Sequence, residues 1–106
     1  MLIHITAKYQ VRPESVQKCV KAVNDLVNYV QKNEPKTLFY LANQDVLNPA
    51  KFFHIIVFED EVGLKLHQSS PASAKFVEIV YPEALKPLEF QEYNIFASKT
   101  ENWRSR

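Results

Sequence analysis

Residues 53–85 read FHIIVFEDEVGLKLHQSSPASAKFVEIVYPEAL, and this stretch decides the fold because its hydrophobic pattern changes from one element to the next. The run from Lys51 to Phe58 is apolar at nearly every position, which predicts a buried β-strand. Asp60 offers a side-chain oxygen to cap a short helix that continues through Gln68. Ser70-Pro71 has the cap-then-proline order that begins another helix. The buried stripe predicted for this last helix contains Ala72, Phe76, Ile79 and Val80.

The flanking sequence adds three strands and one long helix. Leu2 to Val11 alternates between apolar and polar residues, as in a half-buried strand. After a break at residues 12–15, apolar residues recur at helical spacing through about Lys32. Thr37 to Asn43 predicts a second strand, and Phe90 to Lys99 alternates as a fourth. The order βαββαβ predicts an α+β, ferredoxin-like domain over residues 1–99, followed by a polar tail at 100–106.

The predicted third strand is apolar on both faces. Phe53, Ile55 and Val57 lie on one face, whereas Phe52, Ile56 and Phe58 lie on the other. A four-stranded sheet covered by helices on one side should carry polar residues on its open side. The apolar open face therefore predicts that a second copy of the chain covers it, giving a homodimer.

Composition excludes several classes of protein. The chain has 106 residues, of which 46% are apolar, and a formal net charge of +1. This balance leaves no excess of Lys and Arg for a nucleic-acid backbone, so we expect no nucleic-acid partner. The chain lacks an apolar run of the roughly 18 residues needed to cross a bilayer, so we expect no membrane partner. The single cysteine, Cys19, and the absence of a signal-peptide pattern favour a cytoplasmic location.

The stretch from Phe53 onward resembles the antibiotic biosynthesis monooxygenase (ABM) superfamily. In that superfamily an aromatic-ended strand, an acidic helix cap, a helical His and a Ser/Thr-Pro step follow one another, as Phe58, Asp60, His67 and Ser70-Pro71 do here. The resemblance implies a dimeric α/β barrel of two sheets packed face to face. It also implies, in each protomer, a pocket between the sheet and the short helices. Members include cofactor-free oxygenases of quinols and anthrones, an isomerase and haem-degrading enzymes.

Some residues of the family pattern are absent. Lys36 stands where a glycine is usual, Ala72 where a second His is common, and Ile56 where a glutamate is common. The last two changes remove groups that could share proton transfer. The haem-binding pattern is also missing, because Val77 stands near the place of the haem-ligating His. We therefore expect no haem and no other cofactor.

His67 is the candidate catalytic residue. Imidazole titrates near neutrality and can accept a phenolic proton without a cofactor. The alternative is that His67 packs beneath its helix and only bonds to a backbone carbonyl. The candidate substrate-binding residues are expected near the same end of the sheet, and they are His4, Thr6, Phe58, Asn94 and Phe96.

A metal site built from the three histidines is not expected. Imidazole suits zinc, copper and iron. If the first and third strands are antiparallel neighbours, however, His4 and His54 lie about four residues apart, or ~13 Å at ~3.4 Å per residue. His54 is then expected to be a sheet or interface residue.

Three functions remain open from the sequence. The first is a cofactor-independent monooxygenase of a small quinol or polyphenolic aromatic, with His67 as the base. The second is a dimer that binds a small aromatic or signalling molecule without converting it. The third is an isomerase of a small carbonyl compound. A mostly apolar, enclosed pocket would favour the oxygenase, and an open groove would favour the binding protein.

Overall fold

The computed structural model describes residues 1–99, and it confirms the predicted α+β, ferredoxin-like fold. The predicted tail at 100–106 lies outside the described residues. Two short 3₁₀ turns, η1 (Pro13–Ser15) and η2 (Tyr81–Glu83), precede α1 and follow α3. The main elements are, in order, β1 (Ile3–Gln10), α1 (Val16–Asn33), β2 (Thr37–Gln44), β3 (Lys51–Phe58), α2 (Glu61–Gln68), α3 (Pro71–Val80) and β4 (Glu89–Tyr93).

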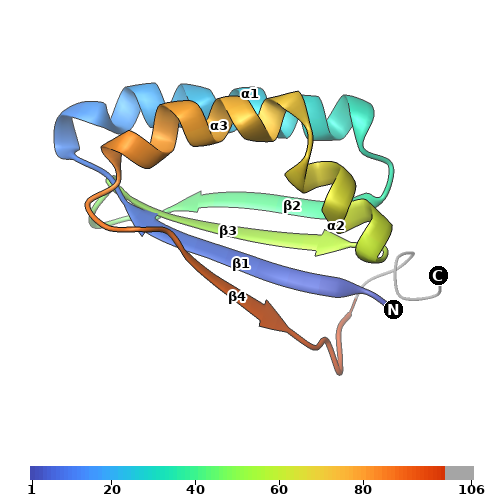
Figure 1. Cartoon of the computed structure of the whole chain (residues 1–106). Helices are drawn as coiled ribbons and strands as arrows, with labels where there is room; N and C mark the ends of the chain where they lie inside the picture. The colour runs from blue at the N-terminus through green and yellow to red at the C-terminus, as the bar shows by residue number, and fades with distance from the viewer. Residues whose placement is uncertain (100–106) are drawn as a thin grey trace.

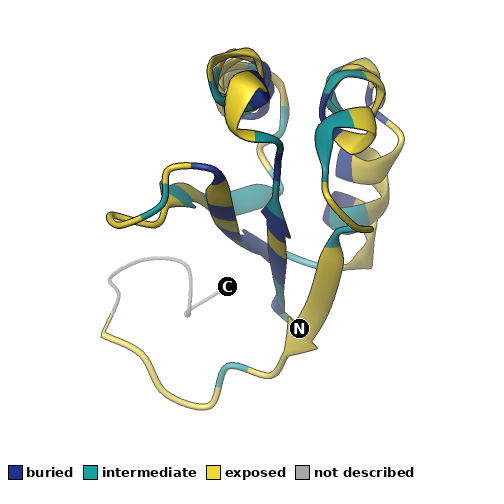
Figure 2. Cartoon of the chain, turned by 90° about the vertical axis from the view of Figure 1, so that its left-hand side faces the viewer, coloured by how far each residue is buried: buried dark blue, intermediate teal, exposed yellow. Residues whose placement is uncertain are grey.

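The four strands form one antiparallel sheet in the order β2-β3-β1-β4. Helices α1 and α3 lie side by side across one face of this sheet, and α2 lies over one end of it (Figure 1). Seen from the side, the other face carries no helix (Figure 2). The molecule therefore has two layers, with its core between the helices and one face of the sheet.

The core consists of two apolar clusters that meet along β3. One contains Phe52 with residues of β1, α1 and α3, including the buried thiol of Cys19. The other contains Ile56 and Phe58 packed with Ile3 and the start of α2. Because alternate residues of a strand share a face, His54 lies on the same face as Phe52 and Ile56, between the two clusters. A polar side chain is thus built into the centre of the core.

The two short helices begin at the predicted caps. The Asp60 carboxylate accepts a hydrogen bond from the backbone N–H of Gly63 at 3.0 Å. The Ser70 hydroxyl accepts from the N–H of Ser73 at 3.0 Å, and Pro71 occupies the first helical position. Each cap satisfies an N–H that has no partner within its helix, so it stabilises the helix start by about 1 kcal/mol.

The fourth strand is shorter than predicted, because it ends at Tyr93 rather than Lys99. β4 is an edge strand that pairs only with β1, and Tyr93 already lies opposite His4. Beyond this point β1 has only Ile3 left to offer as a partner. An alternating sequence cannot remain in a sheet once the neighbouring strand has ended.

The open face of the sheet is apolar. Residues of β2, β3 and β4 on this face expose large apolar side chains to solvent, namely Phe39, Leu41, Phe53 and Tyr93. Exposed apolar patches of this kind often mark sites of protein–protein interaction. On the third strand itself, Phe53 is exposed on this face, whereas Val57 is buried.

Gly63 is needed because its backbone lies very close to Lys36. It is not needed for a turn, since its φ is not positive. A Cβ on Gly63 would lie 2.9 Å from both the Cβ and the carbonyl oxygen of Lys36. That oxygen accepts the N–H of Glu59 at 2.8 Å and cannot easily move.

We expect Gly63→Ala to lower the free energy of unfolding by about 1–3 kcal/mol, as overpacking does. Alanine normally stabilises a helix interior relative to glycine by about 1 kcal/mol. The sign of the change in the free energy of unfolding therefore separates helix propensity from overpacking. Urea denaturation is the measurement. Lys65→Ala, on the exposed side of the same helix, is the control and should change stability by less than about 0.5 kcal/mol. A Gly63→Ala protein more stable than wild type would contradict the contact.

Candidate functional site

A buried pair of side chains, Glu34 and His67, lies between the end of α1 and the end of α2. The Nδ1 atom of His67 is 2.9 Å from Oε1 of Glu34. The side chain of His67 is 11% exposed and that of Glu34 is 6% exposed. The two residues are far apart in sequence, and the contact forms because Glu34 caps the C-terminus of α1 while α2 packs against the start of β2.

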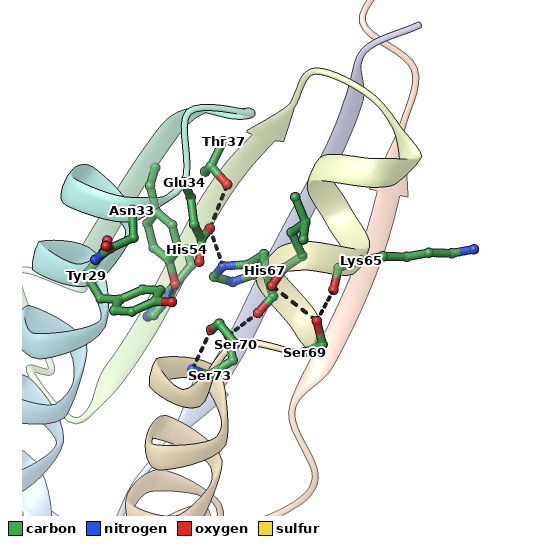
Figure 3. Close-up of polar contacts among 12 residues, drawn as sticks. Tyr29, Asn33, Glu34, Thr37, His54, Lys65, His67, Ser69, Ser70 and Ser73 are labelled. Carbon is green, nitrogen blue, oxygen red and sulfur yellow. Dashed lines mark hydrogen bonds and ion pairs between the residues drawn. The ribbon is translucent and has the colours of Figure 1, made fainter.

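Neighbouring hydroxyl groups hold both members of this pair. Thr37 donates its hydroxyl to Oε1 of Glu34 at 2.8 Å. Ser73 donates its hydroxyl to the backbone carbonyl of His67 at 2.5 Å. Figure 3 shows these contacts reaching Glu34 from the start of β2 and His67 from the first turn of α3. The pair is therefore positioned from two sides before any ligand binds.

This geometry defines the chemistry that His67 can perform. With its Nδ1–H donated to Glu34, a neutral imidazole keeps the lone pair on Nε2 and can accept a proton there. No described residue forms a hydrogen bond with Nε2. On Glu34, the second oxygen, Oε2, is buried and has no hydrogen-bond partner among the described residues. A carboxylate that orients an imidazole is the arrangement that prepares a histidine for general-base catalysis.

A second polar group lies deeper in the core. The ring of His54, which is 1% exposed, contacts two tyrosine hydroxyls. Nδ1 is 2.8 Å from the hydroxyl of Tyr40, and Nε2 is 2.9 Å from the hydroxyl of Tyr9. Burial raises the pKa of both tyrosines above the ordinary value, so both stay protonated. A neutral His54 can then accept from one hydroxyl and donate to the other, which satisfies both ring nitrogens.

The cluster of His54 and its two tyrosines lies close to the Glu34–His67 pair. The ring centroids of Tyr40 and His67 are 5.9 Å apart, and those of Phe58 and His67 are 5.4 Å apart. Burial, and to a lesser extent the nearby His67, lower the pKa of His54 from 6.5 to about 4. His54 is therefore neutral at pH 7 and does not add a charge beside His67.

The low pKa of His54 predicts acid sensitivity. Between about pH 6.5 and pH 4 the unfolded chain binds a proton at His54 that the folded chain does not, so stability falls as the pH decreases through this window. One pKa unit corresponds to about 1.4 kcal/mol, so the expected loss is about 3 kcal/mol. Denaturant unfolding at pH 7 and at pH 4 measures it, and a His54→Gln variant should lose most of the dependence.

A second acid-sensitive group titrates in a different window and serves as an internal comparison. Ser15 and Lys18, together with Arg12, hold the pKa of Glu83 at about 2, below its ordinary value of 4.5. Stability from Glu83 is therefore lost only below about pH 4.5. An unchanged stability between pH 6.5 and pH 5 in the wild type would show that His54 does not titrate as its burial requires.

The structure brings together only part of the predicted site. Phe58 lies next to His67, as expected. His4 and Thr6 lie opposite Val57 and Ile55, on the open face of the sheet, whereas His67 is under the helices. The expectation that His4 shares a pocket with His67 is therefore not met within this chain, because the sheet separates them.

The other predicted binding residues lie after β4. Asn94 lines a hollow beside Ile3 and Asp60, at the N-terminal end of β1. Phe96 is exposed to solvent. Neither contacts His67 in the described structure, so a role for them in substrate binding stays a prediction.

Two features of the site differ from what the sequence predicts. Glu34 is not among the predicted site residues, because nothing in its local sequence indicates that it reaches His67. His54 was expected at the sheet surface or an interface, but it is a core residue, because the face it shares with Phe52 is the one that the helices cover. The only available sequence signal for the Glu34–His67 contact is an acidic residue at the end of one helix and an imidazole on the next helix.

Among residues 1–99 the structure has no group of three His, Cys, Asp or Glu side chains placed to hold a metal ion. The register explains this for the histidines. His4 lies opposite Val57 and His54 lies opposite Ala7, so the two are three residues apart along the strands and on opposite faces. That the protein needs no metal or cofactor stays a prediction. In the same range, none of the helices has the length and apolar character of a membrane span.

Comparison with known proteins identifies the family. The family model described as antibiotic biosynthesis monooxygenase matches residues 2–79, which include all elements from β1 to α2 and nearly all of α3. The chain belongs to the ABM family. No curated protein matches.

Solved structures agree with this ABM fold. A conserved protein of Methanosarcina mazei is 25% identical, with a TM-score of 0.80, and the match covers 88% of this chain and 91% of that one. A structure described as an antibiotic biosynthesis monooxygenase is 18% identical, with a TM-score of 0.82 and coverage of 90% and 99%. Rv0793 of Mycobacterium tuberculosis is 11% identical, with a TM-score of 0.85 and coverage of 94% and 100%. At the last two identities the likeness shows the fold alone.

Proposed function

We propose that this ABM-family protein is a cofactor-independent monooxygenase of a small quinol or polyphenolic aromatic, with His67 as its general base. The observation that carries the proposal is the buried contact between Glu34 and His67. It leaves Nε2 of His67 as a proton acceptor in a setting from which most water is excluded. Family membership supports a small-molecule oxygenase, and the substrate class is our inference from the chemistry of this pair.

The proposed reaction uses only the substrate and dioxygen. His67 accepts the proton of a phenolic hydroxyl at Nε2, while Glu34 stabilises the imidazolium through Nδ1–H. The resulting electron-rich anion reduces dioxygen and forms a carbon–oxygen bond with it. Loss of water then leaves a new carbonyl on the ring, so a hydroquinone and O₂ give a hydroxyquinone and H₂O. The substrate supplies all the electrons, and none is required from the protein.

We also propose that the protein acts as a homodimer assembled through the open face of its sheet. The exposed Phe39, Leu41, Phe53 and Tyr93 would be buried in this interface. The rings of His4 and Tyr93 lie side by side on this face, with centroids 5.3 Å apart, and they would form part of the same interface.

One observation favours the second candidate function, a dimer that binds a small aromatic molecule without converting it. The space between the helices and the sheet is filled by packed aromatic rings. Tyr9 stacks on Phe52 with centroids 5.1 Å apart, and Phe76 contacts Tyr9 at 6.2 Å. This packing fills part of the space between the sheet and the helices.

Oxygen consumption by metal-stripped protein, measured across a panel of hydroquinones, separates the two functions. The oxygenase predicts uptake that saturates with one of the substrates. Binding without uptake, measured for the same panel under air, would support the second candidate instead.

A further inference from the structure

We propose that Tyr40 is a one-electron redox site, in which His54 takes up the phenolic proton when the tyrosine is oxidised. The ring of His54 is 1% exposed and lies between two tyrosine hydroxyls. Its Nδ1 atom is 2.8 Å from the hydroxyl of Tyr40, and its Nε2 atom is 2.9 Å from the hydroxyl of Tyr9. The proton transfer proposed at His67 uses none of these three groups. They form a separate polar cluster in the core.

His54 is placed to accept the proton of Tyr40. A tyrosine loses an electron readily when its hydroxyl proton can leave at the same time, because an oxidised phenol is a strong acid. A neutral imidazole with its proton on Nε2 donates to Tyr9 and accepts from Tyr40 at Nδ1. Burial keeps His54 neutral at pH 7 by lowering its pKa to about 4. The proton can therefore move along an existing hydrogen bond, without water at the hydroxyl.

The oxidised state has its hydrogen bonds already in place. After the transfer, His54 is an imidazolium with two N–H donors, and each donor faces a tyrosine oxygen. A buried charge is costly unless it is hydrogen-bonded, and here both donors of the cation have acceptors. A histidine that contacted only Tyr40 would leave one N–H of this cation without a partner. Tyr9 therefore allows the core to hold the oxidised state.

Tyr40, rather than Tyr9, is the tyrosine placed to be oxidised. Burial and, to a lesser extent, the charge of Glu34 raise the pKa of Tyr40. The same carboxylate stabilises the positive charge that oxidation creates at the hydrogen-bonded pair. The ring of Tyr40 also lies against His67, with centroids 5.9 Å apart, so it is close to the candidate catalytic residue.

Stability alone does not require this polar cluster. Apolar side chains of similar shape can replace buried hydrogen-bonded groups at little or no cost in stability. The neighbouring residues on the same face of β3, Phe52 and Ile56, are apolar members of the two core clusters. A histidine at position 54 provides a proton acceptor that an apolar residue could not provide.

The oxidant is an organic peroxyl radical, of the kind that the reaction of an aromatic anion with dioxygen can release. Only this source of the oxidant rests on the proposed function. Tyr40 gives one electron to the peroxyl radical, which becomes a hydroperoxide anion. The O–H bond of Tyr40 breaks and an N–H bond forms at Nδ1 of His54, which leaves a neutral tyrosyl radical beside an imidazolium. Tyr40 thereby removes an oxidising radical from the surroundings of His67.

Flash photolysis tests the redox site without any substrate. The probe is tris(bipyridine)ruthenium(III), formed by a light flash in the presence of persulfate, and Trp103→Phe removes the chain's single, competing tryptophan in all samples. We expect a long-lived tyrosyl radical by electron paramagnetic resonance (EPR), identified by ring-deuterated tyrosine. It should be lost in Tyr40→Phe and retained in Tyr81→Phe, the same change at an exposed tyrosine. A long-lived radical that persists in Tyr40→Phe, or that is lost only in Tyr9→Phe, would overturn the assignment.

Two further measurements test the role of His54 and do not depend on the fold of Tyr40→Phe. In protein with tyrosine at position 40 and ¹⁵N-labelled histidine, pulsed EPR should detect a ¹⁵N nucleus coupled to the radical. His54→Gln keeps a hydrogen-bond acceptor but no base, so the radical should form about 10²-fold more slowly, the lower end of the contribution of a positioned base. Absence of the ¹⁵N coupling, or an unchanged rate in His54→Gln, would show that His54 is not the proton acceptor.

Oxygen uptake separates failure of this site from failure of the proposed function. A radical at Tyr40 after the flash, in a protein that consumes no oxygen with any hydroquinone, supports the redox site and rejects the monooxygenase. Uptake by a protein that forms no radical at Tyr40 overturns the redox site while the monooxygenase stands. If both are correct, Tyr40→Phe should lose activity after fewer turnovers than the wild type, and equal numbers of turnovers would overturn the protective role.

Discussion

Oxygen uptake with a hydroquinone substrate falls by about 10²- to 10⁴-fold when His67 is replaced, since this is the contribution of a single general base. His67→Asn is the more informative change. The Asn amide can still donate to Glu34 as Nδ1 does, but it has no counterpart of the basic Nε2. His67→Ala removes both functions and leaves the buried Glu34 with Thr37 as its remaining hydrogen-bond partner. Initial rates of oxygen consumption, measured with metal-stripped protein, provide the comparison.

The controls separate catalysis from stability. Both His67 variants should retain the oligomeric state and the far-ultraviolet circular dichroism of the wild type. Val62→Asn, at an exposed position on the same helix, should retain full uptake. Equal rates for His67→Asn and the wild type would remove His67 from the mechanism. No uptake by the wild type with any substrate in the panel would favour the non-catalytic binding function.

Placing a charge on the open face of the sheet should dissociate the proposed dimer. Leu41 is 45% exposed on the edge strand β2 and lies opposite Ile55, so Leu41→Arg puts a guanidinium among the exposed apolar side chains of the open face. An uncompensated buried charge costs about 3–5 kcal/mol. A twofold interface contains the change twice, so the dissociation constant should rise more than about 10⁴-fold.

Sedimentation velocity at micromolar concentration measures this effect. We expect a dimer for the wild type and a folded monomer for Leu41→Arg. Val62→Arg adds the same charge to an apolar position of similar exposure on the helical side, and it should remain dimeric. A wild-type monomer at this concentration would refute the dimer, and dissociation by Val62→Arg instead would place the interface on the helices.

The sequence by itself determined the local structure of this protein. The change from strand to helix periodicity after Phe58, the caps at Asp60 and Ser70, and the apolar third strand are properties of neighbouring residues, and each appears in the structure as predicted. The position of His67 on a short helix was predicted in the same way. Hydrophobic period and capping act within a few residues, so they can be derived without knowledge of the fold.

Only the tertiary structure decided what surrounds His67. Glu34 reaches it from the end of another helix, and Tyr40 and Phe58 approach it from two strands. Alternation shows that His4 and Ile3 point to opposite sides of β1, but it does not show which side the helices cover at that end. Register between strands and the docking of helices on the sheet settle that question. Because these depend on packing across the whole chain, the partners of a buried side chain cannot be read from its own segment.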